Sequence, residues 1–573
     1  MHQRCSKNDM FFYRLGSMDE QLDKNKHRGD SYSTKRRRIR ESANASWNLV
    51  VSECIQGTED RHDVNSCEYG SQASYATATC SYQQPEERHE KWDIASDSDD
   101  DSTGTTTYHD SELNFEDSSC ESEADAGCHF QDDSTPIATK IAEWKVKHNI
   151  SQSALQDLLS ILRPSHPELP RDARTLMQTP RSYHIKELSS DGKYVHFGIV
   201  SGIESLNLSN IVSHHLKLQF NIDGLPLYKS SSVEFWPILC SVRDTGTEPF
   251  IVGVYSGKKK PVNLQDFLGE FVSDLGQCVH DGVMIANGRK FTVSIDCFIC
   301  DAPARAYVKN VKYHSGYYGC DKCMQQGDYL EGRMTFPNVA APLRTDVNFD
   351  QLTDEDHHRG PTPLSALDIG LVTSFVLDYM HLVCLGVVRK LIYFWISGPT
   401  RTGDDVASRI PASLVRTLSE RLIELSSSMP RDFARKPRSL HEVERWKATE
   451  FRTFLMYTGP IVLNGILSEP VYNHFLILSA AISLLANDQF CHSYNAYAHK
   501  LLVSFVQQAK VLYGSTFIVY NVHGLVHLAA DVQRYGPLDA FSAFPFENHL
   551  YTLKRSIRKG SAPLAQLLRR VVE

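Results

Sequence analysis

The stretch Leu-Lys-Leu-Gln-Phe-Asn-Ile-Asp-Gly, residues 216–224, decides how the chain folds. Its apolar side chains alternate up to Ile222, which predicts a β-strand that ends at Asp223. Downstream, the pattern predicts two more strands, a helix and a fourth strand that ends at Asp301. We therefore expect an α/β fold built on a mixed sheet. The expected segments are strands at 216–222, 235–242 and 250–255, a helix at 264–275 and a strand at 291–300.

Strand, strand, strand, helix, strand is the order in which a ribonuclease-H-like domain begins. Beyond it, residues 330–520 show long amphipathic helical patterns, including 371–396 and 472–513, and few strand candidates. This pattern predicts a large all-helical insertion that interrupts the ribonuclease-H-like sheet. The expected parts are 206–329 for the first half of the domain, 330–520 for the insertion and 521–573 for the second half.

The composition indicates a soluble intracellular protein with an unusual N-terminal tail. The chain has 573 residues and a net charge of −9, and residues 1–135 carry twice as many acidic as basic side chains. Because this tail lacks hydrophobic periodicity and contains the acidic run Ser96–Ser102, we expect it to be disordered. The longest apolar stretch, Phe475–Ala486, is too short to span a bilayer, and no signal-peptide pattern begins the chain. We therefore expect no membrane association and reduced cysteines.

Two segments before the sheet have more than one interpretation. The basic island Lys35–Arg40 has the density of a nuclear import signal, but a solvated charge cluster would look the same. Residues 136–205 are helical in pattern, and Ser151 or Ser153 could cap the second helix. These helices fit either a small DNA-binding helix-turn-helix or a helical hairpin that packs on the core.

Three carboxylates are candidate ligands for divalent metal. Asp223 and Asp301 end strands that lie side by side in a sheet of this order, so both should emerge at one edge, although each could also be an ordinary turn residue. Glu547 stands in the first turn of a predicted helix, where an acidic residue is common. Lys554 and Arg558, seven and eleven residues further, would share its helix face, as metal and phosphate ligands or as a salt-bridged surface.

A second constellation has the spacing of a structural zinc site. Cys320 and Cys323 form a Cys-x-x-Cys knuckle nineteen residues after Asp301, and His523 and His527 lie one helical turn apart before Glu547. Two thiolates and two imidazoles complete a tetrahedral site that would join the two ends of the insertion.

Two other pairs are less specific. Cys297 and Cys300 lie inside an apolar strand, which favours buried small side chains over metal ligands. Asp378 and His381 open an apolar helix, either packed in the core or close to the active site.

Taken in order, these residues resemble the CACTA (En/Spm) branch of the eukaryotic DDE transposases and animal proteins derived from such transposons. The scheme is also similar to the catalytic core of the V(D)J recombinase, which shares the helical insertion and the zinc ligands on either side of it. The resemblance covers residues 136–573. The matching residues are Asp223, Asp301, Cys320, Cys323, Asp378, His381, His523, His527 and Glu547.

The resemblance implies a DNA transposase. Asp223, Asp301 and Glu547 would hold two Mg²⁺ or Mn²⁺ ions about 3.5 to 4 Å apart, for strand cleavage at transposon ends and strand transfer into target DNA. Zn²⁺ would be structural, Asp378 and His381 would lie near the active site, and the protein would act as a nuclear homodimer on double-stranded DNA. The chain stops on a helical pattern that looks unfinished, so further DNA-binding elements are expected beyond it. The candidate phosphate-binding residues are Arg435, Lys436, Arg438, Lys447, Lys554, Arg555 and Arg558.

Two alternatives stand beside this hypothesis. A domesticated descendant could keep the fold as a non-catalytic nuclear DNA-binding or scaffolding protein. A zinc hydrolase could use His523 and His527, but Gly524 stands where a metalloprotease helix carries its glutamate.

Overall fold

The computed structural model describes residues 136–571, apart from 149, 178–183, 189–191, 207, 209–210, 229–230, 286–287, 399–408 and 559. The acidic tail and its basic island Lys35–Arg40 lie outside the described residues. The described residues form two compact units, one on either side of residues 178–183.

The smaller unit is a set of short helices. Ser151 caps the second helix, because its side chain accepts a hydrogen bond from Ala154 N at 3.2 Å, and this confirms one of the two predicted caps. Leu155 and Leu159 are fully buried in a small apolar core. The helices are α3 (Ile137–Lys147), α4 (Gln152–Leu162) and α5 (Ala173–Leu176).

The larger unit has a mixed α/β fold around a nine-stranded sheet of parallel and antiparallel strands. Its main path runs β1-β2-β6-β5-β3-β8-β11, and the four strands and one helix expected from the sequence are all present. The strands are β1 (Lys186–Glu187), β2 (Lys193–His196), β3 (His215–Ile222), β4 (Leu225–Pro226), β5 (Glu234–Val242), β6 (Phe250–Gly257), β7 (Val283–Met284), β8 (Lys290–Cys300) and β11 (Phe375–Leu377).

Strand β11 corrects the expectation of an all-helical segment at 330–520. It pairs in parallel with β8, with Leu377 opposite Cys300, so the sheet resumes well inside that segment. Two short strands, β9 (Asp328–Leu330) and β10 (Arg333–Thr335), also form a separate hairpin at its start. Each of these strands has only three residues, too few to show a period of two in the sequence.

The sheet is covered on both faces. On one face, α7 (Leu264–Asp281) packs its apolar side on Phe220, Phe298 and their neighbours. On the other face, the alternate residues Cys297 and Ile299 belong to a core shared with the helical segment. Cys297 and Cys300 are both fully buried within β8, as expected for small core side chains.

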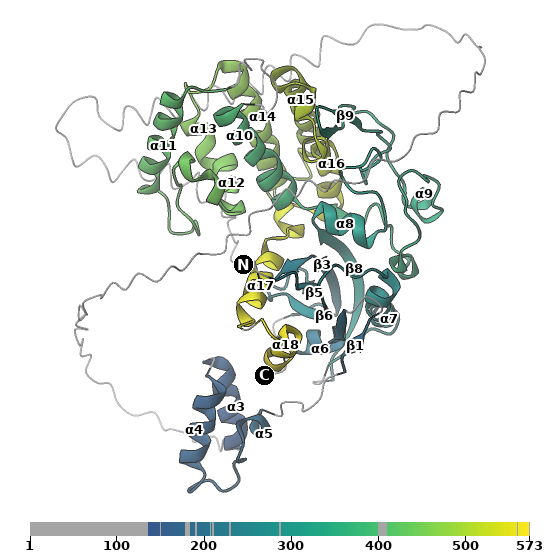
Figure 1. Cartoon of the computed structure of the whole chain (residues 1–573), viewed down its shortest axis with the longest axis vertical. Coiled ribbons are helices and arrows are strands. Elements are labelled where there is room, and N and C mark those ends of the chain that lie inside the picture. Colours follow the sequence, from purple (N-terminus) through teal and green to yellow (C-terminus); the bar gives the residue numbers. More distant parts are fainter. Residues whose placement is uncertain are drawn as a thin grey trace, which may run out of the picture. The chain divides into compact units, whose positions relative to one another are not determined.

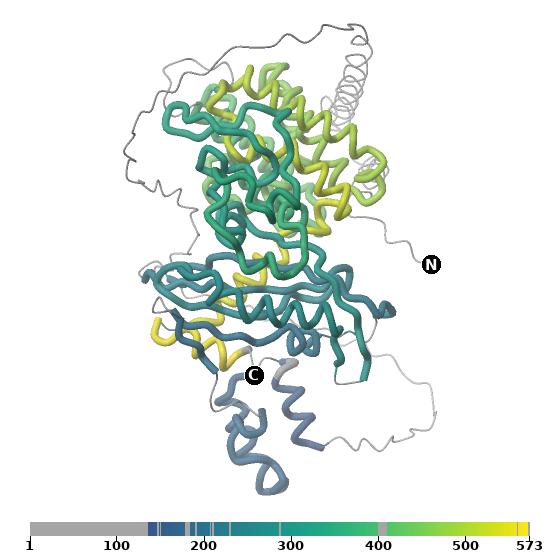
Figure 2. Tube along the Cα trace, turned by 90° about the vertical axis from the view of Figure 1, so that its right-hand side faces the viewer, coloured from purple at the N-terminus to yellow at the C-terminus, as the bar shows by residue number. Residues whose placement is uncertain are grey.

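The helices between β11 and the C-terminal region gather at one end of the larger unit, and the strands of the nine-stranded sheet lie at the other (Figures 1 and 2). The expected helix at 371–396 starts only at Met380, and the expected helix at 472–513 is broken between Leu485 and Asn495. The elements are η2 (Met380–Val388), α10 (Arg389–Ser397), α11 (Ala412–Ser426), η3 (Leu440–Arg445), α12 (Ala448–Thr453), η4 (Phe454–Thr458), α13 (Gly459–Val462), α14 (Glu469–Leu485) and α15 (Asn495–Tyr513).

The connecting and C-terminal elements complete the unit. Helix α17 lies beside the sheet, next to β3 and β5 (Figure 1). The elements are α8 (Ala302–Val308), α9 (Asp346–Asp350), η1 (Pro363–Leu367), η5 (Ser515–Phe517), α16 (Tyr520–Tyr535), η6 (Leu538–Phe541), α17 (Phe544–Ser556) and α18 (Pro563–Val571).

One helical stretch, Met380–Ser397, has the length and composition of a membrane-crossing helix, with a mean hydropathy of 1.4 over 18 residues. Within the protein 56% of this stretch is buried, and Val383, Val387 and Leu391 are fully enclosed in the main core. Core helices of soluble proteins have the same properties, so this stretch does not by itself indicate a membrane.

Candidate functional site

Three aspartates follow directly after three neighbouring parallel strands. Strand β8 lies between β3 and β11 and pairs in parallel with both. Asp223, Asp301 and Asp378 come immediately after these strands. Because the C-terminal ends of parallel strands meet at one edge of a sheet, the three carboxylates start from the same edge. The predicted adjacency of the strands that carry Asp223 and Asp301 is confirmed.

Glu547 reaches this edge from helix α17. Its Oε1 lies 3.7 Å from His381 Nε2, and His381 is the second residue of η2, which follows β11. Burial raises the pKa of Asp223 well above its usual value, and the negative charges of Asp301 and Glu547 raise it further. These three carboxylates are therefore close enough to repel one another.

Asp378 orients His381 and the start of α17. Its Oδ2 accepts hydrogen bonds from the backbone N of His381 at 3.0 Å and from Nδ1 at 2.7 Å. Its Oδ1 accepts one from the backbone N of Ala543 at 2.8 Å, the residue that precedes α17. With both oxygens engaged and a side chain that is 1% exposed, Asp378 acts as a support for the site.

His381 is the cation of this cluster. Burial alone would lower its pKa, but the hydrogen bond to Asp378 and the charges of Asp378, Asp301 and Glu547 raise that pKa to about 10. The pKa of Glu547 is raised by burial, is lowered by His381, and is raised again by Asp378 and Asp301. A protonated His381 therefore partly offsets the crowded negative charge.

Backbone hydrogen bonds hold the two aspartates that follow β3 and β8. One oxygen of Asp223 accepts from Gly224 N, and one oxygen of Asp301 accepts from Ala304 N, each at 2.7 Å. These bonds fix each carboxylate and use one oxygen of each.

The four predicted zinc ligands meet in a buried cluster. Their candidate ligand atoms all lie within 4.8 Å of one another, and all four residues are buried. Cys323 Sγ is 3.3 Å from His523 Nε2, and Cys320 Sγ is 3.6 Å from His527 Nε2. Both histidines lie on α16, one turn apart, and this buried Cys₂His₂ cluster could hold a metal ion.

The cluster also favours a thiolate. Burial would raise the pKa of Cys320, but hydrogen bonds from Cys323, His523 and His527 lower it well below its usual value. The thiolate is the form of cysteine that binds metals. The pKa of Cys323 is raised instead, by its hydrogen bond with Cys320 and by burial, so the fit to a Zn²⁺ ion depends on the donor set and its geometry.

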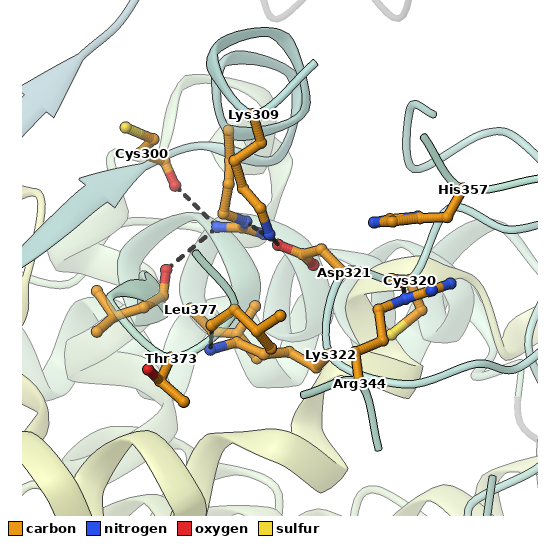
Figure 3. Close-up of polar contacts among 12 residues, drawn as sticks. Cys300, Lys309, Cys320, Asp321, Lys322, Arg344, His357, Thr373 and Leu377 are labelled. Carbon is orange, nitrogen blue, oxygen red and sulfur yellow. Dashed lines mark hydrogen bonds and ion pairs between the residues drawn. The ribbon is translucent and has the colours of Figure 1, made fainter. Parts of the chain in front are cut away.

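A buried ion pair joins the knuckle to the strand that carries Asp301. Asp321, between the two cysteines, accepts from Arg305 Nε at 2.5 Å and from Tyr520 Oη at 2.7 Å. Arg305 also donates to the carbonyl of Cys300 at 3.0 Å, the residue before Asp301 (Figure 3). Lys309 Nζ lies 3.8 Å from the same carboxylate, and burial lowers the pKa of Lys309 to about 7.

A second buried link runs from the knuckle to β11. Lys322 Nζ donates to Asp531 Oδ1 on α16 at 2.9 Å and to the carbonyl of Val372 at 3.0 Å. Asp531 Oδ2 accepts from the backbone N of Leu377, the residue before Asp378, at 2.8 Å. The sequence alone did not identify Arg305 or Asp531 as parts of the site. The sequence signal was the presence of two charged residues, Asp321 and Lys322, between the two cysteines of the knuckle, since buried charges need partners of opposite charge.

The candidate DNA-binding residues fall into groups with different surroundings. Arg435, Lys436 and Lys447 are exposed on the loops before α12. Arg438, in contrast, pairs with Glu450 at 2.7 Å, which fills much of its hydrogen-bonding capacity within the protein.

The cations after Glu547 need one correction. Lys554 and Arg555 lie in the last turn of α17, and the Arg555 guanidinium lies 5.7 Å from the ring of Tyr551. Arg558 does not share the helix face with Glu547, because α17 ends at Ser556 and Ile557 has an extended backbone. Arg558 N instead bonds to Gln566 Oε1 at 3.1 Å.

Comparison of the chain with protein-family models and with curated proteins gives no match. Any inference about the function of the chain therefore depends on the carboxylate cluster and the Cys₂His₂ cluster. Each brings together residues that are more than 150 positions apart in the sequence.

Proposed function

We propose that the chain is the catalytic core of a DDE-type DNA transposase with a ribonuclease-H-like fold. The observation that carries the proposal is the meeting of Asp223, Asp301 and Glu547 at one edge of the sheet, from two parallel strands and a distant helix. The resemblance to the CACTA branch requires two adjacent strands that are each followed by an aspartate. It also requires a glutamate on a helix much later in the chain, as on α17.

The three carboxylates would hold Mg²⁺ or Mn²⁺, which when bound would activate water and then a 3′-hydroxyl for in-line attack on a phosphodiester. Asp223 and Asp301 are held by hydrogen bonds from their own following backbone, which limits the motion of the ligand oxygens. Asp378 holds His381 beside Glu547, so the glutamate has a fixed cationic neighbour. His381 is therefore a positioning residue for Glu547.

The Cys₂His₂ cluster would hold a structural Zn²⁺. Its four buried side chains would fill all four positions of a tetrahedral ion and leave no position for a substrate. Arg305 and Lys322 link the knuckle to the residues before Asp301 and Asp378. Zinc would thus stabilise the strand ends from which the aspartates start.

The substrate would be double-stranded DNA at transposon ends and at a target site. Arg435, Lys436 and Lys447 are exposed cations that would contact phosphates, and Lys554 and Arg555 follow Glu547 on its helix. We further propose action as a homodimer in the nucleus, without a membrane partner.

A cleavage assay tests the proposal. Purified protein is incubated with supercoiled plasmid that carries the DNA flanking its gene, with Mg²⁺, Mn²⁺ or EDTA. The proposal expects metal-dependent nicking and joining that Asp223→Asn abolishes, because the substitution removes a charged ligand. Glu424→Gln, at an exposed position on α11, is the matched control and should retain activity.

Binding of the DNA that flanks the gene, without cutting under either metal, would contradict the proposal. That result would favour the alternative of a domesticated, non-catalytic DNA-binding protein.

A further inference from the structure

A polar triad of Arg452, Tyr379 and Asp539 joins the helical segment to the residues around the carboxylate cluster. Arg452, on α12, donates through Nε to Tyr379 Oη at 2.5 Å and through Nη2 to Asp539 Oδ2 at 2.7 Å. Tyr379 Oη donates to Asp539 Oδ1 at 2.8 Å. The three groups come from three separate segments and close a ring of hydrogen bonds.

Two members of this triad are next to residues of the site. Tyr379 follows Asp378, and Asp539 lies in η6, four residues before Ala543. Because Ala543 N bonds to Asp378, the stretch 539–543 is held at its start by the triad and at its end by Asp378. Glu547 N bonds to the carbonyl of Ala543 at 2.9 Å, so the position of this stretch sets the position of Glu547.

The triad is asymmetric in its exposure. Tyr379 is fully buried, whereas the side chains of Arg452 and Asp539 are 24% and 50% exposed. A hydroxyl buried this deeply needs a hydrogen-bond partner. Because the Arg452 side chain is partly exposed, it can be replaced without opening the core. The loss of its two hydrogen bonds would loosen Asp539.

Arg452 also follows the exposed cations of the helical segment. Lys447 is the residue that precedes α12, its backbone N bonds to Glu450 Oε2 at 2.9 Å, and α12 packs against η2, which begins at Met380. Arg452 thus lies on a short helix that packs against the segment of His381.

We propose that Arg452, on the helical segment, is a positioning residue that holds Glu547 in place. This inference rests on the proposed metal-dependent DNA cleavage. Arg452 acts through Asp539 and Tyr379 and does not itself touch the reacting atoms.

The test compares Arg452→Met and Arg452→Lys with Arg421→Met. Arg421 is a matched control, because it lies in the same helical segment and donates to the carbonyls of Val462 and Asn464, both at 2.8 Å. Binding of Mn²⁺ to the whole protein without DNA is measured by electron paramagnetic resonance, and kcat and KM are measured with plasmid DNA.

Loss of a residue that orients a metal ligand typically weakens metal affinity or activity by about 10- to 100-fold. We expect Arg452→Met to raise the Mn²⁺ Kd and to lower kcat by roughly that factor, with KM for DNA unchanged. Arg452→Lys should restore part of both, since its ammonium can still reach one acceptor. Arg421→Met should change neither quantity, whatever it does to stability.

Equal Mn²⁺ affinity and kcat in Arg452→Met and Arg421→Met would overturn the positioning role of Arg452 and leave the proposed function intact. If the wild type neither binds Mn²⁺ nor cuts DNA, the proposed function fails, and the positioning role fails with it.

Discussion

Neutralising Asp321 should destabilise the protein strongly while leaving every proposed metal ligand in place. Asp321 is 4% exposed and Arg305 is 3% exposed, so the pair is shielded from water. Burial alone would raise the pKa of Asp321, but Arg305, Lys309 and Lys322 hold it well below its usual value. The carboxylate is therefore charged at neutral pH.

The substitution Asp321→Asn keeps the size of the side chain and removes the charge that Arg305 needs. Removing one partner of a buried ion pair typically costs about 3–5 kcal/mol, because the other charge is left uncompensated. Tyr520 would also lose a charged acceptor. We expect the free energy of unfolding to fall by an amount in this range.

Urea unfolding followed by circular dichroism, with the zinc content measured on the same samples, checks this expectation. Glu187→Gln is the control, because its pair with Lys193 is exposed and such pairs contribute about 0–1 kcal/mol. If the free energy of unfolding falls no more in Asp321→Asn than in the control, the Arg305 ion pair does not stabilise the contact between the knuckle and the strand before Asp301.

Three further outcomes follow from the same contacts. Cys320→Ser should lose bound zinc, as measured by mass spectrometry, and should unfold at lower urea, since the Cys₂His₂ cluster would lack one ligand. His474 is buried and its pKa is lowered by that burial from 6.5 to about 4, so the unfolded chain takes up its proton at a higher pH than the folded one. Stability from this group is present above pH 6.5 and is lost as the pH falls towards 4, by about 3 kcal/mol at most, and His474→Phe should remove that part of the pH dependence in urea titrations. Lys436→Ala should weaken DNA binding and reduce the salt slope by about one, whereas Arg438→Met, which breaks the pair with Glu450, should lower stability and leave the slope unchanged in fluorescence anisotropy titrations.

Local patterns were sufficient for the first part of the fold and for the zinc ligands. The alternation before Asp223 and the apolar run before Asp301 predicted two strands that lie side by side, and the structure pairs them in parallel. The spacing of Cys320 and Cys323, and of His523 and His527, predicted four residues that the structure brings into one cluster.

Sequence patterns did not predict short elements, or contacts between residues that lie far apart in the chain. Strand β11 has three residues in an apolar run, so no alternation separates it from the helix that follows. Arg558 keeps helical spacing from Glu547, but the helix ends two residues earlier. The partners of Arg452 lie 73 and 87 residues away, and no local pattern encodes such separations.

Anomalous scattering from crystals of the protein soaked in Mn²⁺ tests whether the three carboxylates bind metal together. We predict a manganese peak bound by Asp223, Asp301 and Glu547, which Glu547→Gln weakens. Manganese found elsewhere on the protein, with no peak among these three carboxylates, would contradict it.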